Sequence, residues 1–148
     1  MRDPDCPFCG IAAGRSEARI VFESPEAMAF LPLNPASRGH TLVIPRDHHA
    51  DFLTMPSGLN GPVYTAASIV GHALDRALSP EGMNLISSAG EAATQTVLHA
   101  HIHLVPRWRG DEIGGIWPTA RTTGDELQDD IAGLIRAEIL KGRQSVHF

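Results

Sequence analysis

Apolar residues recur along this chain at two spacings. The shorter one, with an apolar residue at every second position, predicts five strands. Runs that are rich in β-branched and aromatic residues and are bounded by turn formers are typical of strands. Such runs cover Arg19–Glu23, Ala27–Leu31 and residues 41–44, 84–88 and 99–105. Short turns and one long insertion separate these runs, so we expect them to pair as hairpins in an antiparallel sheet.

The longer spacing, with three or four residues between apolar positions, predicts helices. A long helix is expected after Gly61 and Pro62, and its apolar face comprises Val63, Ala66, Ala67, Val70, Ala73, Leu74 and Ala77. A C-terminal helix over about residues 123–141 carries the stripe Leu127, Ile131, Leu134, Ile135 and Ile139. Thr123 and Glu126 match a capping box at its start. With a short helix over residues 8–13, the pattern predicts an α+β fold of about five antiparallel strands, one long helix and a C-terminal helix.

The last predicted strand contains three histidines, His99, His101 and His103, which alternate with apolar residues. Period two places the three imidazoles on one face of a strand and the apolar residues on the other. Buried imidazoles need partners, and clustered titratable groups mark functional sites. Such imidazoles can attack phosphorus, transfer protons or bind a metal near neutral pH.

The two cysteines of the chain, Cys6 and Cys9, form a C-x-x-C pair. In a reducing cytosol this spacing favours a metal half-site or a redox pair over a structural disulfide. Zinc would need two more ligands, for which histidines are the obvious source. Reduced thiols without metal remain the alternative on spacing alone.

Composition narrows the class of protein. The chain has 148 residues, 43% hydrophobic residues and a net charge of -5, which are typical of one soluble globular domain. The negative net charge argues against general nucleic-acid binding. No apolar run approaches the roughly 18 residues that a membrane span needs, and residues 1–10 show no signal-peptide core. We therefore expect a cytoplasmic protein without nucleic-acid or membrane partners.

The histidine segment, residues 99–105, resembles the histidine triad signature of the HIT superfamily. Similar residues recur in bacterial HIT proteins at Cys6 to Cys9, Leu31 to Pro35, Gly39 to Arg46, His48, Gly90, Gln95 to Val97, and Pro106-Arg107. The resemblance covers about residues 6–117 and is followed by the C-terminal extension. It implies a HIT-like fold, with residues 1–148 forming a single HIT domain.

This resemblance implies a nucleotide hydrolase or transferase that acts at the α-phosphate of nucleoside phosphoramidates or dinucleoside polyphosphates. His101 would be the nucleophile that becomes nucleotidylated, and His103 would contact the phosphate. His99 would orient the site through its backbone carbonyl. The matching positions also include Gln95 and Thr96, for the leaving group and phosphate oxygens, and His40, a further histidine beside the triad.

The resemblance also assigns binding residues. A base and sugar pocket would be lined by Phe8, Ile11, Phe30, Leu33 and Leu42, and the nucleotide-binding set is completed by Ser88, Gln95, Thr96, His101 and His103. Taken alone, the apolar members are also what a core would contain. Cys6, Cys9, His48 and His99 match the residues that hold a structural zinc, which catalysis would not require. A homodimer is expected, with residues 62–78 and the sheet edges at its interface.

Three positions depart from the family pattern. Pro32 stands where many members have an aspartate that grips the ribose hydroxyls, and Ser88 stands where asparagine is common. Ribose recognition is therefore expected to be weak, supplied by other residues, or directed to another ligand. Thr94 replaces a common glycine, and threonine does not adopt positive φ cheaply, so the phosphate loop is expected to differ in shape.

Two other functions fit parts of the pattern. A metal-dependent hydrolase would use the histidines as catalytic ligands and would lose activity in chelator. A nucleotide-binding protein could keep the fold without efficient chemistry. Covalent labelling of His101 by a reactive nucleotide separates the second of these from the enzyme.

Overall fold

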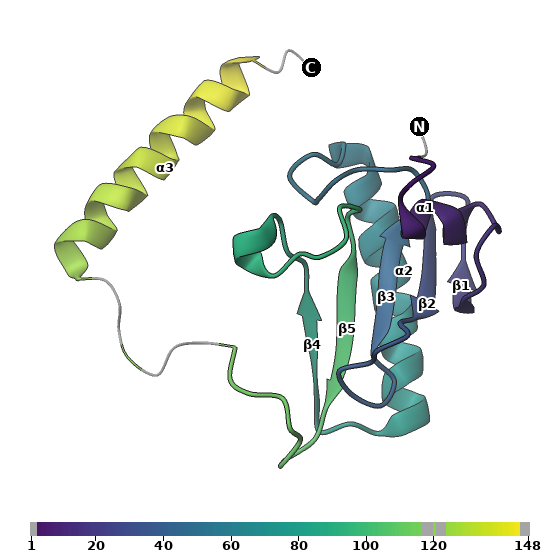
Figure 1. The fold of residues 1–148 in the computed structure, drawn as a ribbon. Coiled ribbons are helices and arrows are strands. Elements are labelled where there is room, and N and C mark those ends of the chain that lie inside the picture. Colours follow the sequence, from purple (N-terminus) through teal and green to yellow (C-terminus); the bar gives the residue numbers. More distant parts are fainter. Residues whose placement is uncertain (1–2, 117–119, 121–123, 146–148) are drawn as a thin grey trace. The chain divides into compact units, whose positions relative to one another are not determined.

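The computed structural model describes residues 3–116, 120 and 124–145. The chain divides into two compact units, Met1–Ile113 and Gly114–Phe148 (Figure 1). Strands and helices of the first unit are α1 Pro7–Ala12, β1 Arg19–Glu23, β2 Ala27–Leu31, β3 Thr41–Pro45, α2 Ser57–Leu78, β4 Gly82–Ile86, η1 Glu91–Ala93 and β5 Ile102–Arg107. The second unit contains α3, Asp125–Ser145. Within the described ranges, no helix has the length and apolarity that crossing a membrane requires.

A single five-stranded sheet with antiparallel pairing organises the first unit, in the order β1-β2-β3-β5-β4. The predicted α+β fold, with its antiparallel sheet, long helix and C-terminal helix, is confirmed. Three pairings form a row across the sheet: His103 opposite Leu42, Leu42 opposite Phe30, and Phe30 opposite Ile20. Directly opposed residues point to the same face, so this row joins the histidine strand to the far edge of the sheet.

Strand alternation gives the sheet two buried faces, because successive side chains point to opposite sides. One face packs on α2 through Ala27, Ala29, Val43 and Leu104, against Val63, Ala66, Ala67 and Val70 of the helix. The other packs on α1 through Met28, Phe30, Leu42 and Ile44, against Cys6, Phe8, Cys9 and Ala12. His103 therefore lies on the α1 face, whereas Ile102 and Leu104 belong to the α2 face.

The histidine strand is shorter at its start than predicted. It begins at Ile102, so His99 and His101 precede it instead of belonging to it. The reason is local hydrogen bonding: the carbonyl of His99 accepts from the His101 ring, and the amide of Ala100 donates to the carbonyl of His49. The strand also continues through Pro106, which lies beyond the last pair with β3 and has only β4 beside it. A proline without an amide donor is tolerated at such a position.

Helix α2 begins at Ser57, before the predicted start, and contains Pro62 in its second turn. A proline there removes one hydrogen bond near the helix end, and the packing of the buried face against the sheet compensates for this loss. Strand β4 is Gly82–Ile86, two residues earlier than predicted. Helix α1 is Pro7–Ala12, and Pro7 occupies the first turn, where proline is favoured.

Helix α3 extends to Ser145, four residues beyond the predicted end at 141. Its predicted stripe keeps the helical spacing, and Leu127, Ile131, Leu134, Ile135 and Ile139 are all exposed. The capping residue Thr123 lies outside the described residues, whereas the first turn carries Asp125 and Glu126. Acidic side chains in this turn complement the helix dipole.

Candidate functional site

His101 is held in one orientation and one tautomer. Its Nδ1 lies 2.6 Å from the carbonyl oxygen of His99, so Nδ1–H is the donor and Nε2 carries the lone pair. The ring is buried and meets Phe8 edge-on, with centroids 5.4 Å apart. The ring of His103 lies beside it at a centroid distance of 4.8 Å. The unprotonated ring nitrogen of His101 therefore belongs to a ring that lies next to a second imidazole.

A chain of hydrogen bonds sets the tautomers of the other two imidazoles. The amide of Ala36 donates to His40 Nδ1 at 2.9 Å, so His40 carries its proton on Nε2. His40 Nε2–H then donates to His103 Nδ1, also at 2.9 Å. His103 must therefore carry its proton on Nε2 when it is neutral. Burial, reinforced by the neighbouring His101, lowers the pKa of His40 and takes the pKa of His103 to about 4, so both rings are neutral donors at pH 7.

The lowered pKa of His103 makes the folded state sensitive to acid. Its pKa falls from 6.5 to about 4, so between these values the unfolded chain binds more protons, and stability declines as pH falls through this window. The melting temperature should therefore drop less steeply on acidification for His103→Gln than for wild type, as followed by scanning fluorimetry. His72→Gln, on the exposed side of α2, is the control. Parallel curves for wild type and His103→Gln would contradict this expectation.

An open cavity on the α1 face collects most of the predicted site. It has a volume of ≈ 760 Å³ and brings together Phe8, Ile11, Phe30, Leu33, His40, Leu42, Thr96, His101 and His103. Pro32, the departure at the predicted ribose position, also lines it, as do Glu17, Arg19 and Asn34. The sequence did not indicate the last three, because no local pattern reports which residues of loops and strand ends border a cavity.

Gln95 and Ser88 lie outside the residues that line this cavity. Gln95 is buried, and its amide group donates to the carbonyls of Ala50 and Val97 while its oxygen accepts from the amide of Gly90. It therefore braces the loop before the histidines from inside. Ser88 is half-buried just after β4. The neighbouring Ser87 donates its hydroxyl to the carbonyl of His101 at 2.9 Å, a contact the sequence did not indicate.

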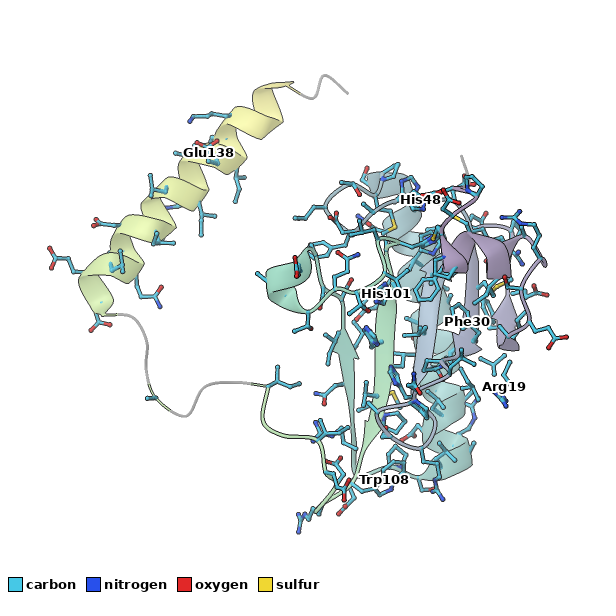
Figure 2. The ribbon with its side chains drawn as sticks, viewed as in Figure 1. Arg19, Phe30, His48, His101, Trp108 and Glu138 are labelled. Atoms are coloured by element: carbon cyan, nitrogen blue, oxygen red, sulfur yellow. The ribbon has the colours of Figure 1, made fainter. Side chains whose placement is uncertain are left out.

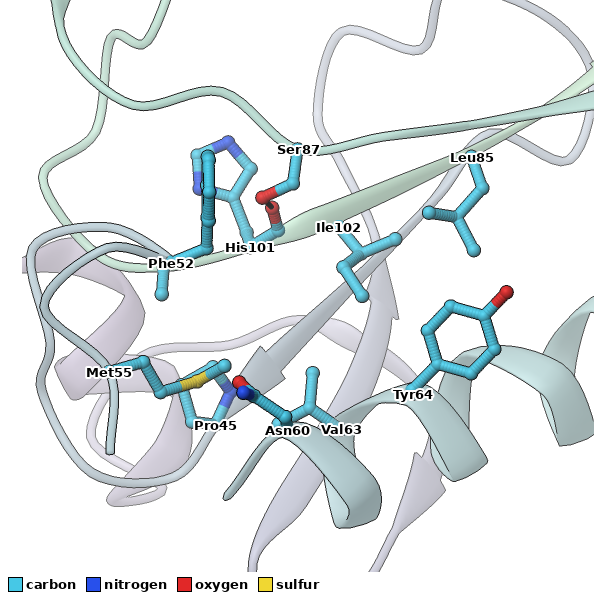
Figure 3. Close-up of a pocket in the computed structure, with 11 residues that line it drawn as sticks. Pro45, Phe52, Met55, Asn60, Val63, Tyr64, Leu85, Ser87, His101 and Ile102 are labelled. Atoms are coloured by element: carbon cyan, nitrogen blue, oxygen red, sulfur yellow. Dashed lines mark hydrogen bonds between the residues drawn. The ribbon is translucent and has the colours of Figure 1, made fainter. Parts of the chain in front are cut away.

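A second cavity lies on the α2 face, behind the backbone of His101 (Figure 3). It has a volume of ≈ 330 Å³ and is mostly apolar, with Met55, Val63, Tyr64 and Leu85 in its walls. Figure 3 shows the Ser87–His101 hydrogen bond at its edge. The His101 peptide thus separates this cavity from the larger one on the α1 face.

The loop before the histidines contains a strained residue. Thr94 has φ +68°, in the left-handed region that costs a non-glycine residue about 1–2 kcal/mol. Thr94→Gly should therefore raise stability by roughly 0.5–1 kcal/mol, after allowance for the freedom of glycine in the unfolded chain. Urea unfolding measures this change. Ala93→Gly, at an exposed neighbour within η1, should destabilise instead, and a loss of stability in both variants would refute the strain.

Four potential metal ligands converge where α1 meets the histidine segment. Ligand atoms of Cys6, Cys9, His48 and His99 all lie within 4.8 Å of one another. The Nε2–H of His99 donates to the carbonyl of Pro45 at 2.9 Å, which turns its Nδ1 toward the two sulfurs. Burial raises the pKa of the Cys9 thiol and lowers the pKa of His99 to about 4. These residues form a candidate metal site of two sulfur and two nitrogen ligands.

Comparison with known proteins identifies the family. The HIT domain family model matches residues 13–110, and the chain therefore belongs to the HIT family. It is 34% identical over 116 residues to Protein hit of Bacillus subtilis, covering 78% of this chain and 80% of that protein. It is also 32% identical over 107 residues to the adenylylsulfatase HINT3 of Arabidopsis thaliana, covering 72% of this chain and 54% of that protein.

Solved structures show the same fold. A HIT family protein from Bacillus anthracis superimposes with a TM-score of 0.83 at 31% identity, over 91% of this chain and 97% of its own. A histidine triad nucleotide-binding protein from Candida albicans gives a TM-score of 0.81 at 27% identity, over 93% and 99%. A zinc-bound histidine triad family protein from Mycobacterium smegmatis gives 0.70 at 29% identity, over 96% and 98%.

Proposed function

We propose that this protein hydrolyses or transfers nucleotides at the α-phosphate of nucleoside phosphoramidates or dinucleoside polyphosphates. The observation that carries the proposal is the fixed tautomer of His101, whose Nδ1–H bonds the His99 carbonyl and whose Nε2 keeps its lone pair. This ring lines the large cavity together with His103. A neutral, oriented imidazole is the form that a nitrogen nucleophile requires.

The reaction would proceed in two displacements. In the first, His101 Nε2 attacks the α-phosphorus, a P–N bond forms, and the bond from phosphorus to the leaving amine or phosphate breaks. The leaving group departs with the electron pair and takes a proton from solvent. In the second, water attacks phosphorus, the P–Nε2 bond breaks, and the surplus proton of water returns to solvent. If another nucleophile attacked in place of water, the nucleotidyl group would be transferred to that nucleophile.

The surrounding residues would stabilise the charge that develops. His103 is a neutral donor through Nε2–H, because His40 holds its Nδ1, and it can donate to a phosphoryl oxygen. The His99 carbonyl stabilises the cationic imidazole of the adduct through the Nδ1–H bond. Thr96 also lines the cavity and offers a hydroxyl. Gln95 would act as a positioning residue, since its polar atoms are engaged within the loop.

Trapping the intermediate tests this function. The protein is mixed with adenosine 5′-phosphoramidate, quenched under alkaline conditions and analysed by intact and peptide mass spectrometry. We expect one adenylyl group per chain, located on His101, and release of the label by acid, as a phosphoramidate requires. Turnover without any adduct on His101 would refute the covalent route.

The two other functions are less well supported. A metal-dependent hydrolase would need its metal at the histidines of the cavity, whereas the group of potential ligands found in the described part of the chain uses His99 with Cys6, Cys9 and His48. A binding protein without chemistry would not need the tautomers of His101 and His103 to be set as they are. Both features favour an enzyme.

We propose that the four-ligand cluster holds a structural zinc ion. Zinc prefers tetrahedral sulfur and nitrogen ligands, and its usual bond lengths give a sulfur-to-nitrogen separation of about 3.6 Å. The distances from Cys9 Sγ to Nδ1 of His48 and of His99 are 3.4 and 3.6 Å, and Cys6 Sγ lies 3.5 Å from His99 Nδ1. With all four positions taken by protein, zinc would tie α1 to the histidine segment and take no part in the reaction.

We also propose a homodimer that pairs through α2 and β4. Strand β4 is an edge of the sheet. An edge strand presents unpaired backbone N–H and C=O groups, which another chain can pair with or cover. Tyr64, Ile69 and Leu85 are large apolar residues on these two elements, and each is exposed. Light scattering should give a dimer mass for wild type and a monomer mass for Leu85→Lys. A monomeric wild type would refute the assembly and leave the chemistry untouched.

A further inference from the structure

The backbone of His101 lies where the pairing of the sheet stops. His101 directly precedes β5, and Figure 2 shows it among the side chains of the first unit. The pairs between β5 and β3 end at Ile102, and the pairs between β5 and β4 end at His103. Because His101 is buried and a buried carbonyl without a hydrogen bond is costly, its carbonyl needs a partner from outside the strand ladder.

Ser87 supplies that partner. It follows the last residue of β4, Ile86, and its hydroxyl donates to the His101 carbonyl at 2.9 Å (Figure 3). If β4 and β5 continued their register, Ser88 would lie opposite His101, so a side chain from the neighbouring position replaces the ladder here. The His101 carbonyl is thereby fixed at the edge of the second cavity, where Ser87 and Leu85 form part of the wall.

Two hydrogen bonds hold His101 from different sides. On the α2 side Ser87 holds its carbonyl, and on the α1 side its ring Nδ1–H donates to the carbonyl of His99 at 2.6 Å. The second bond spans only two residues, so its geometry depends on the backbone angles between them. Because Ile102 is fixed by its pair with β3, a change in the backbone angles of His101 would shift the segment before it and the ring. A misplacement of about 1 Å can slow a reaction by about a hundredfold, so the Ser87 bond controls a distance that matters for attack.

We infer that Ser87 is a positioning residue for the nucleophile and that it acts through the backbone carbonyl of His101. This inference rests on the proposed nucleotide chemistry and adds a residue to it. Ser87 is not among the described residues that line the large cavity, where a substrate would lie. Its hydroxyl proton is also engaged by the His101 carbonyl. Ser87 therefore holds the reacting residue and does not itself touch the substrate.

Ser87→Ala removes the hydroxyl and tests the positioning. The full chain is mixed with adenosine 5′-phosphoramidate, and the growth of the adduct on His101 is followed by rapid quench and intact mass spectrometry. At saturating substrate we expect the rate constant of adduct formation to fall roughly tenfold to thirtyfold, which is within what a small misplacement costs. The substrate concentration that gives half of the maximal rate should change less than about twofold, because Ser87 makes no contact in the large cavity.

Two substitutions of equal shape separate the hydroxyl from the volume it occupies. Ser87→Thr keeps the hydroxyl, whereas Ser87→Val has a methyl group in its place, and the adjoining second cavity has room for the added atoms. Ser87→Thr should retain a rate near that of wild type, and Ser87→Val should be as slow as Ser87→Ala. Circular dichroism reports the fold of each variant, and this pair carries the test if Ser87→Ala does not fold.

A second serine provides the matched control. Ser24 is also half-buried, and its hydroxyl donates to the carbonyl of Ala27 at 3.3 Å in the turn between β1 and β2. Ser24→Ala should lower the melting temperature and keep the wild-type rate of adduct formation. Loss of a hydroxyl-to-carbonyl bond in the same sheet is therefore separated from loss of the bond that holds His101.

The tautomer of His101 gives a readout that does not depend on turnover. Long-range proton–nitrogen NMR spectra at neutral pH show which ring nitrogen carries the proton. Wild type and Ser24→Ala should carry it on Nδ1, as the bond to the His99 carbonyl requires. In Ser87→Ala a share of the molecules should carry it on Nε2, because the segment that sets this bond is loosened.

Three results would overturn the inference: a wild-type rate in Ser87→Ala, equal slowing in Ser24→Ala, or equal rates in folded Ser87→Thr and Ser87→Val. The failure of the proposed function looks different, because wild type itself would then form no adduct on His101. In that case a tautomer shift in Ser87→Ala and Ser87→Val, but not in Ser87→Thr, would sustain the hold on His101 and reject the chemistry.

Discussion

His101→Ala is expected to reduce the hydrolysis of adenosine 5′-phosphoramidate and diadenosine tetraphosphate by on the order of a thousandfold or more. The reason is that a covalent route ends when its nucleophile is removed. The hydrogen bond from Nδ1 to the His99 carbonyl is lost with the ring. Initial rates under saturating substrate, read by chromatography of the released nucleotide, measure the effect.

Two controls test whether the loss of activity is specific to the His101 ring: a chelator and a second histidine variant. Wild-type turnover should persist in chelator at 25 °C while circular dichroism shows the protein folded, because no step requires a metal. His72→Ala is the matched control, since His72 is exposed on α2 and bonds to the Ser68 carbonyl. Residual activity of His101→Ala near the wild-type rate would reject the nucleophile. Immediate loss of activity in chelator without unfolding would instead favour the metal-dependent hydrolase.

Loss of the zinc ligands is expected to have the second large effect, on stability. Wild type should contain one zinc ion per chain, and Cys9→Ala should contain none. The variant should lose several kcal/mol of unfolding free energy, because the binding energy of a structural zinc contributes directly to folding. Cys9 is fully buried and lies within 3.4 Å of His48 Nδ1, so its removal opens the site. Elemental analysis and urea unfolding measure the two effects.

A pair of adjacent histidines gives the control for this prediction. His48 belongs to the cluster of ligands, whereas His49 contributes its backbone carbonyl to Ala100. His48→Gln should therefore lower zinc content and stability, and His49→Gln should retain zinc. Full zinc occupancy in Cys9→Ala would refute the site, and equal losses in the two histidine variants would show that the effect is not coordination.

Periodicity in the sequence predicted the central elements of the first unit because β2, β3 and α2 each bury a regular face. Alternation in Ala27–Leu31 places Met28 and Phe30 on one side of the sheet and Ala27 and Ala29 on the other. The same rule puts His103 on the α1 face. His99 and His101 precede the strand, because side-chain and loop hydrogen bonds at residues 99–100 replace strand pairing there. Their rings nevertheless lie against Phe8 of α1, on the same side as His103.

The site was predictable where residues carry distinctive chemistry and less so where backbone geometry decides. His40, His101 and His103 come together in one cavity as the resemblance implied. Gln95 carries the expected polar groups, but its contacts with Gly90 and Ala50 show that they serve the loop. Glu17, Arg19 and Asn34 border the cavity without any sequence pattern that indicates it. Such placement depends on loop paths and strand neighbours, which local patterns do not report.

The candidate metal site also has a consequence for the protein during its synthesis. Cys9 and His99 are separated by 90 residues along the chain. At usual rates of translation, roughly 5–20 s pass between the synthesis of the two. During that interval the two thiols exist without the histidine that completes the proposed set of ligands. The four-ligand cluster can therefore form only after the histidine segment has been made, and a chain that stalls before residue 99 lacks both.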